Sequence, residues 1–105
     1  MAQFDVYRNR NAASREAIPY FLLLQHEVIE TRALRVVVPL VPLSRAELPI
    51  SRLNPIFEIE GRKLILSTLE IAGISTSFLG GDIVASLSHR RDEIIAAIDF
   101  LVTGI

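Results

Sequence analysis

Short strand-like runs followed by a single helix-like segment are the feature that most constrains the fold. Between residues 3 and 79, apolar runs of strand length alternate with prolines, glycines and polar stretches. From Ser88 onward, the apolar spacing is that of an amphipathic helix. This order predicts a mainly β or α+β domain, in which a small antiparallel barrel or curled sheet carries a C-terminal α-helix.

The strand-like runs differ in how clearly they are bounded. Strands are expected at residues 3–7, 19–25, 34–40 and 74–79, and in both arms of a hairpin over 55–67. The hairpin is the clearest, because Gly61 follows Glu60 at its centre and supplies the positive φ that a tight turn needs. In residues 19–25, the side chains that point to either face of the strand are mostly apolar, so this strand is expected to be buried on both faces.

Prolines and glycines mark the expected interruptions. Pro39 and Pro42 restrict the strand at 34–40 to an edge, a bulge or a strand end. The pair Gly80-Gly81 is predicted to be a turn, because it lacks the Lys-Ser/Thr pair or third glycine of a phosphate-binding loop.

Residues 88–103 carry the signals of a helix start and of two helix faces. Ser88 is expected to cap the N-terminus, and acidic residues follow where the helix dipole favours negative charge. The stripe expected to face the core contains Ile94, Ile98, Leu101 and Val102, with Ile95 at its margin. The opposite face collects Asp92, Ala96, Asp99 and Thr103. Phe100 lies beside this polar face, where it either packs on a neighbouring loop or a second copy or contacts a partner.

The apolar content is high for a chain of this size. The 105 residues predict a single domain over residues 1–105. Of these residues 50% are hydrophobic and the mean hydropathy is +0.41, which is more apolar surface than a small core buries easily. We therefore expect an exposed apolar patch, most simply a homodimer interface, with a dense single core as the alternative.

Charge and residue usage exclude several classes of function. A net charge of −1 gives no basic field, so direct DNA or RNA binding is disfavoured. The absence of cysteine excludes disulfides, thiolate zinc sites and cysteine nucleophiles. His26 and His89 show no metal-ligand spacing, and no cofactor motif is present. No signal peptide and no apolar run of about 20 residues are found, so we expect a soluble, cytoplasmic protein without membrane contact.

Four segments, taken in order, resemble a known family. The chain opens with QFDVY, continues with VIETRALRVVVPL and then SLSHRRDEIIAAID, and closes with GI. The order of these segments resembles the CcdB family of bacterial toxins from toxin–antitoxin modules. The resemblance runs from Gln3 to Ile105, with loop-length differences near residues 10–17.

This resemblance implies a fold and an activity. The implied fold is an SH3-like barrel of the CcdB/MazF type with an extra small antiparallel sheet, assembled as a homodimer. The implied activity is not enzymatic and needs no cofactor: family members bind the A subunit of DNA gyrase and trap its cleaved-DNA complex. A CcdA-like antitoxin neutralises the toxin with a disordered, mostly acidic tail, and the complex represses its own operon. The antitoxin supplies the DNA contacts, so the toxin meets DNA only indirectly.

The resemblance also implies site residues. The positions that match the gyrase-binding surface are His26, Val28, Ile29, Asp99, Thr103, Gly104 and Ile105. The family usually has Trp at the position of Thr103 and Asn at the position of Asp99. That tryptophan stacks on a gyrase arginine, so its loss predicts weaker binding, which a charge-assisted hydrogen bond from the arginine to the Asp99 carboxylate offsets only in part.

The antitoxin surface is expected elsewhere in the chain. Residues 8–16 are polar, lack periodicity and predict a mobile loop. Arg8, Arg10 and Arg15 in this segment suit an acidic tail, and they are the expected antitoxin contacts.

Other functions stay open at this point. Thr31, Arg32 and Arg35 lie near two glutamates, and this charged corner is either a solvated turn or the acid–base site of a MazF-like endoribonuclease toxin. A CcdB homologue that has lost or changed gyrase poisoning is a further alternative, as is a structural or orphan interaction module.

Overall fold

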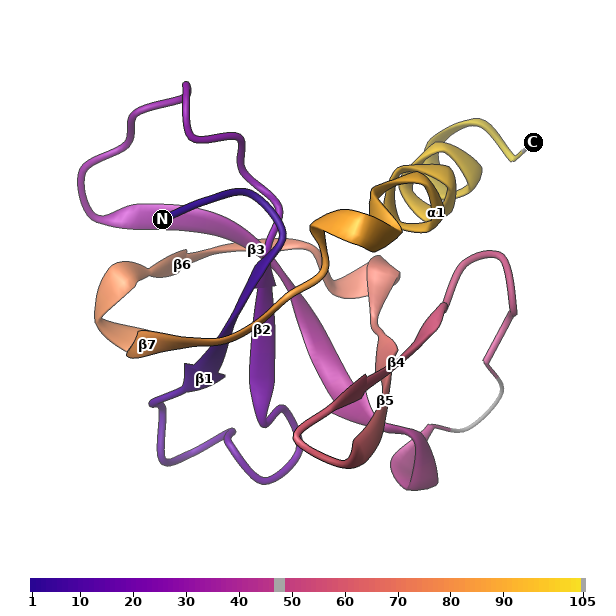
Figure 1. The fold of residues 1–105 in the computed structure, drawn as a ribbon, viewed down its shortest axis with the longest axis horizontal. Coiled ribbons are helices and arrows are strands. Elements are labelled where there is room, and N and C mark those ends of the chain that lie inside the picture. The colour runs from indigo at the N-terminus through magenta and orange to yellow at the C-terminus, as the bar shows by residue number, and fades with distance from the viewer. Residues whose placement is uncertain (47–48, 105) are drawn as a thin grey trace.

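The computed structural model confirms a mainly β fold with a curled antiparallel sheet and one C-terminal helix (Figure 1). It describes residues 1–46 and 49–104. The strands are β1 (Asp5–Asn9), β2 (Tyr20–Leu23), β3 (Leu34–Pro42), β4 (Ile56–Ile59), β5 (Arg62–Leu66), β6 (Ala72–Ser75) and β7 (Leu79–Ser86), and the helix is α1 (Arg91–Thr103). No helix within the described residues is long and apolar enough to cross a membrane.

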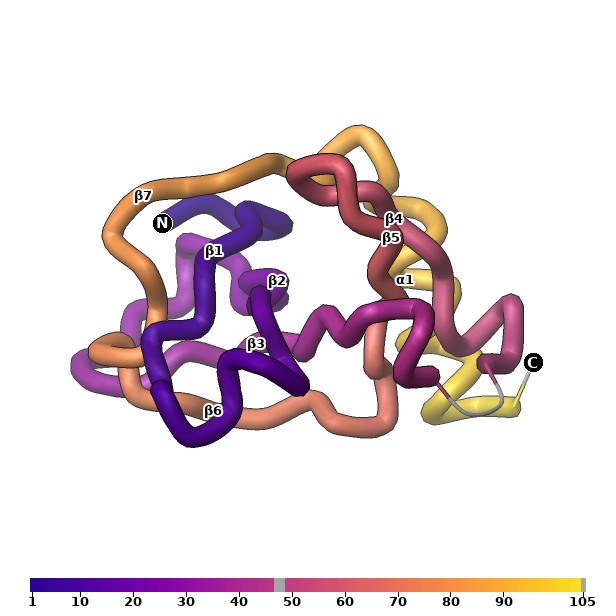
Figure 2. The backbone as a smooth tube through the Cα atoms, turned by 90° about the horizontal axis from the view of Figure 1, so that it is seen from below, coloured from indigo at the N-terminus to yellow at the C-terminus, as the bar shows by residue number. Residues whose placement is uncertain are grey.

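Strand β3 is the centre of the sheet. The strand order is β4-β5-β3-β2-β1-β7, and β6 pairs with the first half of β3 while β5 pairs with its second half. Figure 2 shows β1, β2, β3, β6 and β7 around a half-barrel, with the β4–β5 hairpin and α1 beside it. The hairpin is the small additional part of the sheet, and it joins the rest through β3.

The prolines of β3 occupy positions where a missing N–H costs little. Pro42 ends the strand, as predicted. Pro39 does not lie at an edge, so that part of the prediction is wrong: it pairs with Phe21 of β2 inside the sheet. Its carbonyl accepts a hydrogen bond from the Ser67 amide on the opposite side, at 2.9 Å. The Pro39 nitrogen, which has no hydrogen to donate, therefore lies between the part of β3 that pairs with β6 and the part that pairs with β5.

The β4–β5 hairpin has the predicted tight turn. Ile59 pairs with Arg62, so Glu60 and Gly61 are the two turn residues. Their φ angles are 51° and 76°, which are the left-handed values of a type I′ turn.

Strand β7 was not expected from the sequence. Gly80 and Gly81 lie inside β7 rather than in a turn, and the predicted strand at 74–79 instead divides between β6, a 3₁₀ turn and the start of β7. Gly80 is closely packed: a Cβ there would lie 3.1 Å from the Cβ of Arg8 and 3.2 Å from its carbonyl oxygen, so a larger residue would push β1 away. The glycines therefore mark a close approach of β7 to β1.

Hydrophobic clusters lie on both faces of the sheet. The larger contains Phe4, Val6, Tyr20, Leu22, Val38, Leu40, Phe57, Ile59, Leu64, Leu66, Leu87 and Ile94, and the smaller contains Tyr7, Phe21, Leu23, Val37 and Leu79. Successive residues of β2 alternate between the two clusters, which confirms that this strand is buried on both faces.

Helix α1 packs on the larger cluster with a stripe that differs from the predicted one. Ile94 and Ala97 are fully buried, whereas Val102 is 76% exposed, so its assignment to the core is wrong. The buried stripe is centred between Ala97 and Ile98, which leaves Val102 at its margin. The predicted cap is also wrong, because Ser88 begins the 3₁₀ turn η4 (Ser88–Arg90) and α1 starts only at Arg91.

Candidate functional site

The loop between β2 and β3 presents two apolar side chains to solvent. Val28 is 75% exposed and Ile29 is 58% exposed. The loop is shaped locally, because Nδ1 of His26 accepts a hydrogen bond from the Val28 amide at 3.0 Å and its carbonyl accepts one from the Ile29 amide at 3.0 Å. His26 therefore holds the apolar pair outward, and the structure brings these three predicted site residues together.

The same loop is tied to the first residues of the chain. The Gln3 amide donates to Oε2 of Glu27 at 3.1 Å, and Nε2 of Gln3 donates to the Leu24 carbonyl at 2.9 Å. The hydrogen bond from Gln3, followed by one from its own amide, lowers the pKa of Glu27. The carboxylate is thus charged at neutral pH and anchors the loop.

The charged corner of this loop brings together two of the three residues named for the ribonuclease alternative, Thr31 and Arg35. Nη1 of Arg35 donates to the Thr31 carbonyl at 2.8 Å, and the Thr31 hydroxyl donates to the Leu34 carbonyl. A hollow of about 400 Å³ lies beside them. Nη1 of Arg35 also donates to the Thr31 hydroxyl at 3.0 Å, so these two side chains meet beside the hollow, while Arg32 does not line it.

The end of α1 is the second exposed part of the predicted gyrase-binding surface. Gly104 closes the helix in the left-handed conformation at φ 73°, and its amide donates to the Phe100 carbonyl at 2.9 Å. The Thr103 hydroxyl donates to the Asp99 carbonyl at 2.7 Å, and both residues are exposed one turn apart. Ile105 lies outside the described residues.

Phe100 packs on a neighbouring segment of the same chain. The guanidinium carbon of Arg52, just before β4, lies 4.6 Å from the centroid of the Phe100 ring. Of the two predicted roles, the structure therefore supports packing against a neighbouring loop.

Four arginines surround a hollow at the opposite end of β1 and β2. The hollow has a volume of about 410 Å³ and is lined by Arg8, Asn9, Arg10, Arg15, Pro19, Tyr20 and Arg62. The predicted Arg8, Arg10 and Arg15 thus come together, with Arg8 in β1 and not in the loop. Arg62 of β5 was not predicted, because only the tertiary fold brings this hairpin to the loop. We call these four residues the arginine cluster.

The loop carrying Arg10 and Arg15 is shaped by buried Asn9. Nδ2 of Asn9 donates to the Ser14 hydroxyl and to the Ile18 carbonyl, both at 2.9 Å. Its Oδ1 accepts a hydrogen bond from the Asn11 amide, also at 2.9 Å. These hydrogen bonds fix the course of the backbone that presents the two arginines.

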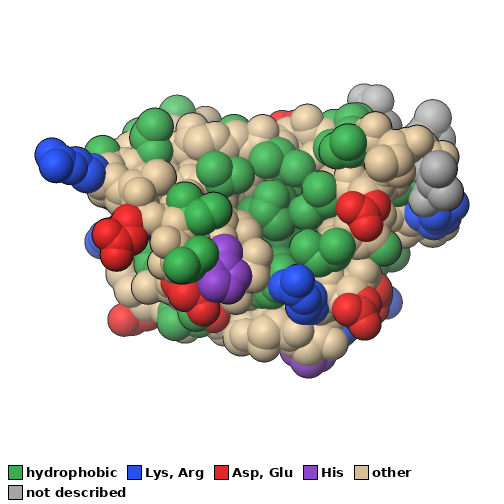
Figure 3. Space-filling model, turned by 90° about the horizontal axis from the view of Figure 1, so that it is seen from above, with side chains coloured by type: hydrophobic (Ala, Val, Ile, Leu, Met, Phe, Trp, Pro, Cys, Tyr) green, Lys and Arg blue, Asp and Glu red, His purple; other side chains and the backbone are tan. Residues whose placement is uncertain are grey.

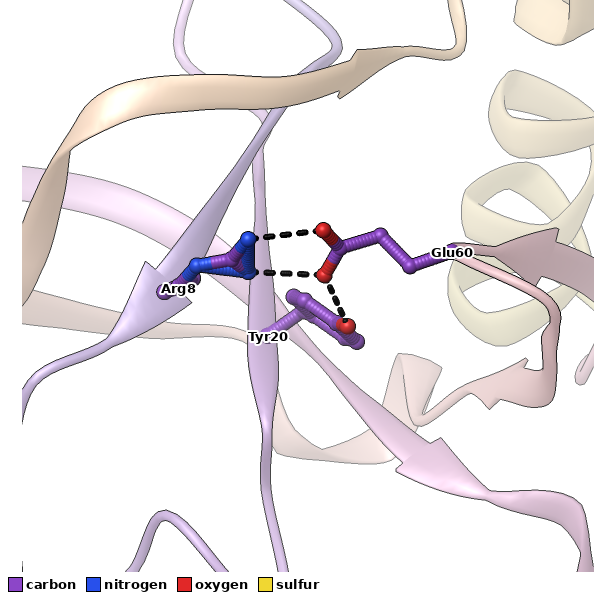
Figure 4. A network of polar contacts seen from close by, with 3 residues as sticks. All are labelled: Arg8, Tyr20 and Glu60. Atoms are coloured by element: carbon purple, nitrogen blue, oxygen red, sulfur yellow. Dashed lines mark hydrogen bonds and ion pairs between the residues drawn. The ribbon is translucent and has the colours of Figure 1, made fainter.

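Arg8 already binds a carboxylate of the protein. Its Nη1 and Nη2 donate to Oε1 and Oε2 of Glu60 at 2.7 and 2.6 Å, and the Tyr20 hydroxyl donates to Oε1 at 2.5 Å (Figure 4). Burial and this hydrogen bond raise the pKa of Tyr20, while nearby Arg62 acts in the opposite direction. The phenol therefore remains a hydrogen-bond donor at neutral pH.

A family model described as CcdB protein matches residues 3–104, nearly the whole chain. The chain belongs to the CcdB family. Membership supports a toxin of a toxin–antitoxin module as the general function. Within the described residues, no group of three or more His, Asp or Glu side chains is placed to hold a metal ion.

The two parts of the predicted CcdB gyrase surface lie at opposite ends of one face. The β2–β3 loop and the end of α1 both lie at the upper edge in Figure 1, and Figure 3 views this face from above. Hydrophobic side chains gather between them (Figure 3). We use the name apolar face for six side chains on the larger-cluster side of the protein: Leu24, Ile71, Ile95 and Ile98 pack against that cluster, and Leu34 and Val36 of β3 are exposed. Within one chain, the two predicted parts of the gyrase-binding surface therefore lie apart from each other.

Proposed function

We propose that this CcdB-family chain is a homodimeric toxin that binds the A subunit of DNA gyrase and traps the enzyme with cleaved DNA. The observation that carries the proposal is the exposure of both predicted contact regions, the Val28–Ile29 pair and the helix end at Asp99 and Thr103. An exposed apolar pair held outward by a loop is a feature of protein interaction sites.

The proposal assigns different contacts to the two regions. Val28 and Ile29 supply apolar area, and the carboxylate of Asp99 pairs with an arginine of gyrase. The Thr103 side chain offers no aromatic ring for stacking, and its hydroxyl is bonded to the Asp99 carbonyl. The chemistry of this helix end therefore favours a charge-assisted hydrogen bond over a cation–π contact.

Calorimetry with the cognate gyrase A fragment tests binding, and a DNA-cleavage assay with whole gyrase tests trapping. We expect saturable binding and an accumulation of linear DNA that depends on the protein. A folded dimer that neither binds the fragment nor increases cleaved DNA would contradict the proposal.

Replacing Thr103 by tryptophan is expected to strengthen gyrase binding. Each restored cation–π contact contributes about 0.5–2 kcal/mol, so two contacts in a dimer raise the affinity by about five- to a thousandfold. Titration calorimetry of Thr103→Trp against the gyrase A fragment measures the gain. Thr103→Val is the matched control, because it removes the hydroxyl–Asp99 hydrogen bond without adding a ring. Equal affinities for Thr103→Trp and Thr103→Val would rule out a stacking role at this position.

The proposed dimer places a second copy on the apolar face. Leu34 and Val36 are exposed on the same side of β3, and the facing residue of β6 beside Val36 is Gly73, which has no side chain. This leaves an open apolar strip between the loop and α1. A symmetric partner covers it and brings both copies of each contact region to the rim of one assembly.

A charge on the apolar face is expected to dissociate this dimer. Val36→Glu places a carboxylate in the proposed interface of each copy, where burial without a partner costs about 3–5 kcal/mol. The dimer dissociation constant then rises by at least about a hundredfold, which sedimentation velocity measures. Val28→Glu is the control, since Val28 is exposed in the β2–β3 loop and is not one of the six residues that define the apolar face, and we expect this variant to stay dimeric. If Val36→Glu dimerises as tightly as Val28→Glu, a different face forms the dimer.

The arginine cluster is the proposed antitoxin surface. Four guanidinium groups around one hollow give a local positive charge in a chain whose net charge is −1. This favours a short acidic segment over a long polyanion such as DNA. In the proposed repressor complex the CcdA-like antitoxin therefore makes the DNA contacts, and the toxin binds the antitoxin tail.

A further inference from the structure

We propose that Glu60 is an internal competitor for acidic partner side chains at the arginine cluster, and that it sets the affinity of this surface. The inference rests on the proposed antitoxin surface and concerns its regulation. The carboxylate of Glu60 binds Arg8 through both oxygens, as a carboxylate of an incoming acidic peptide would. The protein thus carries its own ligand for one arginine of the cluster.

The charge balance of the cluster shows what remains for a partner. Among the described residues, Arg8 is the member of the cluster with a carboxylate within 4.0 Å, and that carboxylate is Glu60. The same hollow is lined by Arg10, Arg15 and Arg62. None of these three forms such an ion pair with the residues that the structure describes. An acidic peptide therefore finds three arginines that have no carboxylate partner among the described residues and a fourth that is already bound.

The contact of Glu60 with Arg8 is placed where it can open. Glu60 and Arg8 keep 39% and 54% of their side-chain area exposed, so solvent reaches the pair and screens it. Glu60 also lies at the tip of the β4–β5 turn, in the left-handed conformation at φ 51°. Release of Arg8 requires a new rotamer of an exposed side chain at a hairpin tip and the loss of its hydrogen bond from the Tyr20 hydroxyl, and it leaves the strand pairing of the hairpin intact.

Tyr20 makes the competition selective for carboxylates. Its hydroxyl donates to Oε1 of Glu60 while Arg8 donates to both oxygens, so three donors converge on one carboxylate. A glutamate or aspartate of a peptide that displaces Glu60 finds the same three donors. The site therefore fits an acidic peptide. Its apparent affinity for that peptide is the intrinsic affinity multiplied by the fraction of molecules in which Glu60 has released Arg8.

Titration of the full-length protein with a hexaglutamate peptide tests the inference. Glu60→Gln removes the competing charge but keeps a side chain of the same shape at the turn, and we expect its affinity for hexaglutamate to rise about three- to tenfold. Glu58→Gln is the matched control, because it makes the same charge change at an exposed position of the same hairpin. Equal affinities for these two variants would overturn the inference, since the gain would then reflect net charge alone.

A double-mutant cycle with Arg8 separates local competition from altered folding. Arg8→Ala is expected to change hexaglutamate binding less than twofold in the wild-type background, where Glu60 occupies Arg8, and to abolish the gain in the Glu60→Gln background. Additive effects of the two substitutions would contradict competition at Arg8.

The outcomes also separate this inference from the antitoxin proposal. If hexaglutamate binds the wild-type protein but Glu60→Gln changes nothing, the antitoxin surface stands and the competitor role fails. If hexaglutamate binds no variant, both fail. Tighter binding of an oligothymidylate of similar charge would show that the cluster recognises nucleic acid and not acidic peptides, and would overturn the assignment.

Discussion

Removal of residues 103–105 is expected to lower the affinity for the gyrase A fragment by at least about a hundredfold, because it deletes three of the seven residues that match the family's gyrase-binding surface, and a few contacts carry most of the free energy of a protein interface. Thr103 and Gly104 are exposed and contribute nothing to the core, so the truncated chain should fold and dimerise. Among what it loses within the fold are the left-handed cap at Gly104 and the Thr103–Asp99 hydrogen bond, both in the last turn of α1. Titration calorimetry of both proteins against the fragment measures the loss.

The control for this truncation lies on the other side of the molecule. The arginine cluster is at the opposite end of β1 and β2, so hexaglutamate binding should be the same in the full-length and truncated proteins. Unchanged gyrase affinity after truncation would remove the helix end from the proposed site. Loss of both binding activities would indicate a folding defect instead.

Ile94→Ala is expected to destabilise the protein by about 2–5 kcal/mol, because it opens a cavity where α1 meets the larger hydrophobic cluster. For a domain of this size, the melting temperature should fall by about 10 °C or more at a fixed protein concentration. Ile94 has no exposed area, so neighbouring side chains fill the space only partly. Chemical denaturation followed by circular dichroism measures the change in the free energy of unfolding.

Val102→Ala is the matched control for this substitution. Both residues belong to the stripe that the sequence predicts as buried, but Val102 is exposed and its truncation should cost less than about 0.5 kcal/mol. Similar losses for the two variants would mean that Val102 is covered in solution, as it would be if the dimer interface extended beyond the apolar face.

The parts of the fold that follow from local chemistry could be predicted from the sequence. The β4–β5 turn follows from the conformational freedom of Gly61, and the burial of β2 on both faces follows from its unbroken apolar run. Strand β7 could not be predicted, because its two glycines have low strand propensity and Gly80 is explained only by contact with Arg8. The place of Pro39 in a central strand could not be predicted either. It depends on tertiary pairing, because the strand on one side of β3 changes from β6 to β5 near Pro39.

The candidate site shows the same division. The exposed pair Val28–Ile29 was expected from the family resemblance, and its exposure agrees with a contact role. Neither Arg62 nor Glu60 could be assigned to the arginine cluster from the sequence, because they are far along the chain from Arg8. Both belong to a hairpin whose tip reaches β1 and β2 only after the sheet has curled.

The pairing of β1 has a consequence for how the chain folds during synthesis. One edge of β1 pairs with β2, which follows closely in the chain. Its other edge pairs with β7, which is synthesised much later, and Asp5 there lies opposite Ser86. As the chain leaves the ribosome, β1, β2 and β3 can assemble while that outer edge still exposes unpaired backbone groups. Such non-local pairing slows folding, so the nascent chain passes through a stage in which it is open to strand exchange with other copies.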